Sequence, residues 1–433
     1  MTPAASQEKI DVAALRVGMF VHLDLGWMAH PFPLSNFRIA SDDQIATIRS
    51  LGVKQVRWSR QDSDEASTPT VPVRPDADAA SPGVAAAAEA VAPASSPEAV
   101  ERAERRRRLA RQRADLQLCE RQFAEAAREC RLATDLVPGK PHDAAGHAAA
   151  LSKALVDKML GEHDLCIRLL SEAAGDKASA HALNVTIISL LMGKTFGLGE
   201  ADMLDLGVGS LMHDIGKIDL PDRMRHREDH FSPSETRFYE EHVGHGVGHA
   251  RKMGLTSGAT LVIAQHHEHA DGSGFPLKLN TDRMTALARI VALVNRYDNL
   301  CNPHLAARAM TPHESLSLLF AQSKSKFDTA ILGAFIKMMG VYPPGSTVQL
   351  TDDRYAMVVA VNSTRPLKPR VLVHEPRVPR DEALVLDLET AAGLGIRRSI
   401  RPQQLPEAAL AYLAPRPRVA YFFEPVPDAD ASP

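Results

Sequence analysis

Between residues 141 and about 340, one segment after another repeats its apolar residues with the spacing of a helix. Examples are HALNVTIISLLMGKTFGLG, EADMLDLGVGSLMHDIGK, GATLVIAQHHEH and MTALARIVALVNRYDNL, which alternate with short loops that contain Gly or Pro. A helix with an apolar face is stable in a protein when that face is buried, so these segments must pack against one another. The sequence therefore predicts an all-helical domain at residues 141–340.

Different patterns flank the helical region. Residues 8–60 combine an alternating segment, IDVAALRVGMFVHLDL, with a helix capped by Ser41, which predicts a small α/β domain. Residues 61–97 are rich in Ala, Pro, Ser and Asp and predict a flexible linker, whereas residues 98–140 predict a charged connector helix. Residues 341–425 alternate with period two and predict a β-rich extension. We expect a mainly α protein with a helical bundle, a small N-terminal α/β domain and a small C-terminal β-rich unit.

Charge and cysteine content exclude several classes of protein. The 433 residues carry a formal net charge of −3, which gives no general reason to bind nucleic acid or an anionic membrane. The four cysteines are widely spaced and form no C-x-x-C pair, which argues against disulfides and thiolate zinc sites. No apolar stretch approaches the roughly 18 residues of a membrane helix. We expect a cytoplasmic protein without membrane insertion, in which the charged helix could join two copies of the chain.

Histidines concentrate in the helical region. In LMHDIGK, His213 and Asp214 are adjacent, and Lys217 follows one helical turn after His213. Adjacent residues on a helix point about 100° apart, so both can reach one metal ion only at a helix end or a distortion, which Gly216 permits. A lone His-Asp pair is more typical of surface residues, so the dipeptide alone is weak evidence.

Further imidazoles accompany this pair. His181 opens an amphipathic helix, His242 lies in EEHVGHG, and His266 and His267 follow the apolar helix ATLVIAQ. Side chains on the ends of consecutive helices can converge in a bundle, and imidazole with carboxylate suits Fe, Mn, Zn or Ni better than Ca or Mg. Any one of these histidines could instead be an ordinary core or surface residue. The histidines expected at the surface are His226, His230, His245, His249 and His269.

Three motifs together resemble the HD-GYP branch of the HD metal-dependent phosphohydrolases: HDIGK at 213–217, HHE at 266–268 and DGSGFP at 271–276. Residues 8–60, with GMFVHLDLGW and HPF, resemble a short domain of unknown function that is often fused to such proteins. The resemblance implies a helical bundle that holds two divalent ions, Fe or Mn, with Zn or Ni as alternatives. It also implies hydrolysis of the bacterial messenger cyclic di-GMP to pGpG or GMP, and a diguanylate cyclase of the GGDEF type as a further partner.

The resemblance also implies roles for individual residues. The first ion would be held by His181, His213 and Asp214. Asp214 would bridge to a second ion held by His242, His266 and His267. Lys217 would contact a phosphate oxygen or the hydroxide bound between the ions, so Lys217 and Asp214 are the expected catalytic residues. The expected substrate or partner loop consists of Asp271, Gly272, Gly274, Phe275 and Pro276.

The sequence departs from the family pattern at several positions. Asn295 stands where the family places an aspartate ligand; an amide oxygen can still coordinate, but it is neutral, so weaker metal binding is expected. Asp298, one turn later, could reach the same pocket but is expected to be structural. Lys177 replaces a glutamate of the three-metal sites, which argues for two ions at most. An arginine-bearing stretch is replaced by CNPHLAARAMTP, where Arg308 could serve instead, as could Arg296 upstream.

The leading hypothesis is therefore a metal-dependent cyclic di-GMP phosphodiesterase. The alternative is a catalytically weakened module that binds cyclic di-GMP or a diguanylate cyclase, which Asn295 and the missing arginine stretch favour. A third hypothesis is an HD hydrolase for another nucleotide, and the DGSGFP segment argues against it.

Overall fold

The structure is a computed structural model that describes residues 7–25, 36–60, 63, 97–161, 164–171, 176–226, 231–322 and 325–425. The chain divides into two compact units, residues 1–110 and 111–433, which are described separately. The predicted linker at 61–97 lies outside the described residues, except for Ser63 and Pro97.

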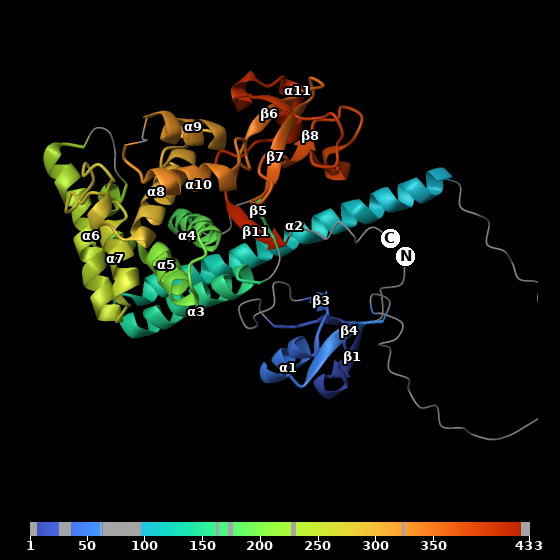
Figure 1. Ribbon diagram of the computed structural model, residues 1–433, viewed down its shortest axis with the longest axis horizontal. Coiled ribbons are helices and arrows are strands. Elements are labelled where there is room, and N and C mark those ends of the chain that lie inside the picture. The colour runs from blue at the N-terminus through green and yellow to red at the C-terminus, as the bar shows by residue number, and fades with distance from the viewer. Residues whose placement is uncertain are drawn as a thin grey trace, which may run out of the picture. The chain divides into compact units, whose positions relative to one another are not determined.

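The first unit contains a four-stranded antiparallel sheet in the order β1-β4-β2-β3 (Figure 1). The strands are β1 (Gln7–Asp11), β2 (Phe20–His22), β3 (Asn36–Arg38) and β4 (Gln55–Ser59). Helix α1 (Asp42–Ser50) begins after Ser41, whose hydroxyl accepts a hydrogen bond from the Gln44 N–H as the sequence predicted. Its core is formed by Leu15, Met19, Val21, Leu23, Ile39, Ile45, Ile48, Val56 and Trp58.

Helix α2 (Pro97–Leu136) begins in the first unit and ends in the second. Its second half carries a buried stripe of small and apolar side chains at spacings of three and four residues. The stripe consists of Cys119, Phe123, Ala126, Cys130 and Ala133. This helix, expected as a charged connector, therefore also contributes to the core of the second unit.

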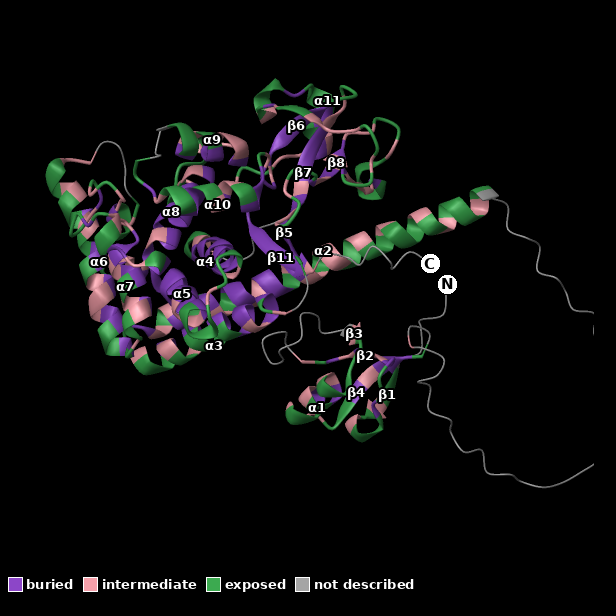
Figure 2. Cartoon of the chain, viewed as in Figure 1, coloured by how far each residue is buried: buried purple, intermediate pink, exposed green. Residues whose placement is uncertain are grey.

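The second unit is a helical bundle, as the sequence predicted. Helix α4 has buried residues on all sides along most of its length (Figure 2), and it packs against α5 and α8. Helix α5 in turn packs against α3 and α7. The helices are α3 (Pro141–Met159), α4 (Lys177–Thr195), α5 (Glu200–Met212), α6 (Pro233–Met253), α7 (Ser257–Gln265), α8 (Ala286–Cys301), α9 (Pro312–Gln322), α10 (Thr329–Met339) and α11 (Glu407–Leu413).

A seven-stranded sheet adjoins the bundle (Figure 1). Strand β5, which precedes α4, pairs with β7 and with the last strand, β11, so the C-terminal β-rich unit shares its sheet with an earlier part of the chain. Strand β11 also packs against α4. The strands are β5 (Leu165–Leu169), β6 (Thr347–Leu350), β7 (Tyr355–Asn362), β8 (Arg370–Val373), β9 (Val385–Asp387), β10 (Ile396–Ser399) and β11 (Tyr421–Pro425).

Two further observations bear on the expected environment of the protein. Within the described parts of the chain, no helix combines the length and the apolar character needed to cross a membrane. All four cysteines are buried free thiols.

Candidate metal centre

Asp214 lies just beyond the end of helix α5. The helix ends at Met212, the Asp214 backbone leaves the helical region (φ −97°, ψ 8°), and a 3-10 turn follows at Ile215–Asp219. The adjacent side chains of His213 and Asp214 consequently meet, with His213 Nε2 3.5 Å from Asp214 Oδ2. The sequence-based expectation of a helix end at this pair is confirmed.

Four imidazoles from four segments surround the Asp214 carboxylate. The Nε2 atoms of His181 and His213 lie 3.7 and 3.5 Å from its Oδ2 atom. The Nε2 atoms of His242 and His266 lie 3.6 and 3.5 Å from its Oδ1 atom. One carboxylate therefore presents each of its oxygens to a different pair of histidines.

The candidate ligand atoms form two groups that share Asp214, and within each group they lie within 4.8 Å of one another. The first group is His181, His213 and Asp214. The second group is Asp214, His242, His266 and His267. The structure thus brings together six of the seven residues that the sequence proposed as metal ligands, and their role as ligands stays a prediction.

Backbone carbonyls orient three of the imidazoles. The Nδ1 atoms of His213, His242 and His266 lie 2.6, 2.6 and 2.8 Å from the carbonyl oxygen three residues earlier in the chain. An N–H is needed to donate to a carbonyl, so the proton of each neutral ring sits on Nδ1. The Nε2 lone pairs are left to face the Asp214 carboxylate, which is the orientation that metal-binding histidines adopt.

Four of the nitrogen and oxygen atoms that face one another in this cluster have no hydrogen-bond partner among the described residues. This applies to Asp214 Oδ1 and to the buried Nε2 atoms of His242, His266 and His267. Each unsatisfied buried polar atom costs about 1–3 kcal/mol, so a cluster of four acceptors is unfavourable by itself. A divalent cation accepts electron pairs from nitrogen and carboxylate oxygen together, so the donor set fits a transition metal ion.

Electrostatics keep these groups in the states that bind metal. Burial lowers the pKa of His213 and of His242 to about 3, and it lowers the pKa of His267 as well, so these rings are neutral at pH 7. Burial would raise the pKa of Asp214, but the positive charge of Lys217 and the neighbouring His213 hold it well below its usual range. The centre therefore combines neutral imidazoles with an ionised carboxylate.

Lys217 lies beside the bridging carboxylate. Its Nζ atom is 2.6 Å from Asp214 Oδ2 and 5.5 Å from the centroid of the Tyr239 ring. Burial favours the neutral amine, but Asp214 and Tyr239 outweigh it and raise the pKa of Lys217 above its usual value. Lys217 is therefore a fixed positive charge at the edge of the cluster.

Two protein families match the sequence. Residues 164–331 match the HD domain family, and residues 7–143 match a domain of unknown function, DUF3391. Residues 164–331 form an HD domain. Both matches agree with the resemblance seen in the sequence, and the DUF3391 match extends beyond the first sheet through helix α2.

Several curated proteins that are similar to this chain have names that state an activity. The chain is 27% identical over 375 residues to cyclic di-GMP phosphodiesterase PA4108 of Pseudomonas aeruginosa, with 84% of both chains covered. It is 21% identical over 191 residues to cyclic di-GMP phosphodiesterase PdeB of Borreliella burgdorferi, covering 44% of this chain and 50% of the relative. It is 28% identical over 163 residues to 3'3'-cGAMP-specific phosphodiesterase 2 of Vibrio cholerae, covering 37% of this chain and 31% of the relative. The chain spans most of the first relative and half or less of the other two.

Phe275, in the expected substrate loop, packs against the second ligand group of the HD domain. Its ring lies 4.4 Å from the His267 ring between centroids, with the planes 23° apart. Glu268 is fully buried, and its carboxylate accepts the N–H groups of Leu277 and Leu279 at 2.6 and 2.8 Å. The loop is thereby fixed beside His267.

Gly274 allows the same loop to approach the ligand-bearing segment. A Cβ atom at this position would lie 2.4 Å from the backbone nitrogen of His269, closer than real contacts permit. Pro276, which follows Phe275, is exposed, and so is Asp271, which accepts the Ser273 N–H at 3.0 Å in the turn that includes Gly272. Phe275 therefore supports a candidate ligand, and a substrate contact by Asp271 or Gly272 stays a prediction.

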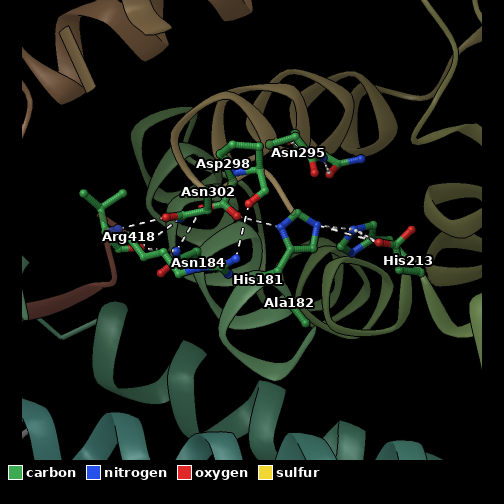
Figure 3. Close-up of polar contacts among 12 residues, drawn as sticks. His181, Ala182, Asn184, His213, Asn295, Asp298, Asn302 and Arg418 are labelled. Carbon is green, nitrogen blue, oxygen red and sulfur yellow. Dashed lines mark hydrogen bonds and ion pairs between the residues drawn. The ribbon is translucent and has the colours of Figure 1, made fainter. Parts of the chain in front are cut away.

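Asn295 and Asp298 both lie on helix α8 of the HD domain. Asn295 is 2% exposed, and its side-chain oxygen accepts a hydrogen bond from Asn299 Nδ2 at 2.6 Å. Its predicted role as a metal ligand stays a prediction. Asp298 is fully buried, and its Oδ2 atom lies 2.6 Å from His181 Nδ1 (Figure 3). The residue expected to be structural therefore contacts a candidate ligand directly.

Four of the five histidines expected at the surface, His226, His245, His249 and His269, have partners in the structure, and His230 lies outside the described residues. The rings of His226 and His304 stack with centroids 4.0 Å apart. Burial lowers the pKa of His226 to about 4, and the nearby His304 and Lys217 add to this effect, which places His226 near the cluster. His249 is buried and lies 2.8 Å from Asp219 Oδ2, so the surface prediction is wrong for His249. Histidine type and spacing alone did not reveal these partners.

We expect the metal-free HD domain to lose stability as the pH falls from about 6.5 toward 3. An unfolded histidine binds a proton below a pKa of about 6.5, whereas His213 and His242 resist protonation in the folded protein until a pKa of about 3. The unfolded state therefore takes up more protons, and each histidine lowers the free energy of unfolding by about 1.4 kcal/mol per pH unit. Urea titrations of chelator-treated protein at pH 7, 6 and 5 measure this slope. A slope that His213→Gln leaves unchanged would contradict the assignment.

Proposed function

We propose that this protein hydrolyses cyclic di-GMP by means of two divalent ions bound in the HD domain. The observation that carries the proposal is a single carboxylate, Asp214, whose two oxygens face two groups of imidazoles. Two cations that lie close together need an anionic bridge to offset their repulsion, and Asp214 offers one oxygen to each group. Two of the relatives reported above are named cyclic di-GMP phosphodiesterases, which supports this substrate.

The proposed ligands follow the two groups. His181, His213 and Asp214 would hold the first ion, and Asp214, His242, His266 and His267 would hold the second. Asn295 is proposed as an additional neutral ligand. Imidazole and carboxylate ligands favour Fe or Mn, with Zn and Ni as alternatives.

The bound ions would supply Lewis-acid polarisation of the phosphodiester and activation of water. The residues of the chain would orient the substrate around the ions and neutralise the charge of its phosphates. Lys217 offers a fixed positive charge to a phosphate oxygen, because its pKa keeps it protonated. Phe275 covers His267 and excludes water from that side.

A direct assay tests this function. Protein loaded anaerobically with Mn or Fe is incubated with cyclic di-GMP and, separately, with 3'3'-cGAMP, and the products are separated by chromatography. We expect cyclic di-GMP to be converted to pGpG or GMP, and 3'3'-cGAMP to react more slowly. The proposal would be excluded if protein that contains two ions per chain hydrolyses neither compound. If 3'3'-cGAMP is hydrolysed faster than cyclic di-GMP, then 3'3'-cGAMP would be the substrate instead.

A binding module without catalysis is the second candidate, favoured by the neutral Asn295. Asn295→Asp discriminates between the two. In a competent enzyme the added carboxylate tightens ion binding, on the order of tenfold, and changes turnover by less than about tenfold. Metal titrations and turnover assays on both forms measure these effects. A rise in turnover from background to a high rate would favour the binding module. Asn299→Ala, which removes only the partner of Asn295, serves as the matched control.

A further inference from the structure

The chain segment that leads into β11 is linked, through the side chains of two asparagines, to the buried carboxylate that contacts His181. This segment, residues 418–421, runs past the end of helix α8 and the side of helix α4 (Figure 3). It lies about 90 residues beyond the part of the chain that matches the HD domain family, which ends at residue 331. Its contacts therefore extend the candidate metal centre beyond that family domain.

Asn184, on helix α4, makes the first connection. Its Nδ2 atom donates to Asp298 Oδ1 at 2.8 Å and to the Val419 carbonyl at 3.0 Å. Its side-chain oxygen accepts the Tyr421 N–H at 3.0 Å. Asn184 is 1% exposed, so all three bonds form away from water.

Asn302, which follows helix α8, also bonds to both Asp298 and Val419. Its Nδ2 atom donates to Asp298 Oδ1 at 2.8 Å and to the Val419 carbonyl at 2.9 Å. Its side-chain oxygen accepts the Val419 N–H at 2.8 Å. Both asparagines thus join one carboxylate oxygen to one backbone carbonyl, and an amide group is the side chain that can donate two such bonds while accepting a third.

The other oxygen of Asp298 holds His181. His213, His242 and His266 are oriented by carbonyls of their own chain segments, whereas His181 Nδ1 lies 2.6 Å from Asp298 Oδ2. The contact assigns the proton to Nδ1 and leaves Nε2 facing the cluster, 3.2 Å from His213 Nε2. His181 is therefore the candidate ligand whose orientation depends on another side chain.

We propose that residues 418–421 support the first metal site: Asn184 and Asn302 hold Asp298 against this segment, and Asp298 positions His181. The proposal rests on the proposed metal centre and adds a positioning role for Asp298, Asn184, Asn302 and the C-terminal segment. The same segment fixes the loop of His304, because Arg418 Nη2 donates to the carbonyls of Pro303 and His304 at 3.3 and 3.4 Å. The C-terminal extension is thus part of the site and not an independent appendage.

Asn302→Ala in the full chain tests the proposal. Asn302 is only partly buried, so its loss is better tolerated than that of Asn184. Removing the outer partner of a metal ligand weakens metal binding by about 10- to 100-fold, and Asn302 acts through that partner, Asp298, so we expect a loss at the lower end of this range. We expect Mn titrations to show this loss for one of the two ions, with the other unchanged. Nitrogen-15 spectra of the metal-free protein should show the His181 proton shifting from Nδ1 toward Nε2.

Tyr297→Phe is the matched control. It removes the 3.2 Å contact between the hydroxyls of Tyr297 and Tyr421, which joins helix α8 to the same strand without involving Asp298. We expect normal ion binding and an unchanged His181 tautomer in this variant. Equal effects of Tyr297→Phe and Asn302→Ala on ion binding would show that the segment only packs the strand, and would overturn the proposal.

Asp298→Asn tests the same positioning role if Asn302→Ala fails to fold. The variant keeps the size of the side chain, but its single oxygen cannot accept from His181 and from both asparagines together. We expect the same selective loss of one ion, and unchanged binding of both ions contradicts the proposal. Wild-type protein that binds no metal would instead refute the proposed function, and the tautomer measurement on metal-free protein separates these two failures.

Discussion

Asp214→Ala is expected to remove both ions from the protein and to lower the hydrolysis of cyclic di-GMP by about a thousandfold or more. Each oxygen of this carboxylate faces a different pair of imidazoles, so no other residue of the cluster can replace it in both groups. A bound metal contributes several kcal/mol to phosphoryl transfer, and about 4 kcal/mol corresponds to a thousandfold in rate. Elemental analysis and initial rates on the same preparation measure both effects.

Asp222→Ala provides the matched control for this prediction. Asp222 is also an aspartate paired with a basic residue, Arg225, but its side chain is 92% exposed. We expect normal metal content and normal rates in this variant, because an exposed ion pair contributes little. Full metal occupancy in Asp214→Ala would contradict the shared-carboxylate arrangement.

Gly216→Ala is expected to have the second largest effect, on folding and on metal content together. A Cβ atom at this position would lie 1.9 Å from the His242 carbonyl oxygen and 2.4 Å from the Gly246 backbone nitrogen. These are backbone atoms of helix α6, which cannot rotate out of the contact as side-chain atoms can. The 3-10 turn that follows Asp214 would therefore have to move away from α6. We expect the free energy of unfolding to fall by about 3 kcal/mol, with loss of the second ion because His242 is displaced from Asp214.

Gly244→Ala tests whether the effect comes from this contact. Gly244 lies on the same helix α6, and a Cβ atom there would meet nothing within 4 Å. Alanine favours a helix over glycine by about 1 kcal/mol, so this variant should be as stable as the wild type or slightly more stable. Urea unfolding curves of the two variants compare them directly. Equal stability of both would contradict the close packing at Gly216.

The sequence predicted the helical bundle because its signals are local. Apolar spacing within each helix and turn residues between helices are readable in short windows. The pairing of β5 with β11 was not predicted, because Leu165–Leu169 is a five-residue run whose partner lies some 250 residues later. Nothing local in such a short segment identifies a distant strand.

The candidate site was likewise predicted only in part from the sequence. The groups of histidines around Asp214 follow from motifs at helix ends, and the helix end at His213 could be expected because adjacent side chains must share a pocket. The contact between Asp298 and His181 could not be read from spacing, because it depends on two asparagines and on a strand from the end of the chain. Support from distant segments becomes visible only once the chain is folded.

The location of the ions in a crystal tests the central claim most directly. Diffraction data collected at the absorption edge of the loaded metal reveal each ion independently of any activity. We predict one anomalous peak among His181, His213 and Asp214 and a second among Asp214, His242, His266 and His267. Peaks only at other sites, or a metal-saturated crystal with no peak beside Asp214, would contradict this prediction.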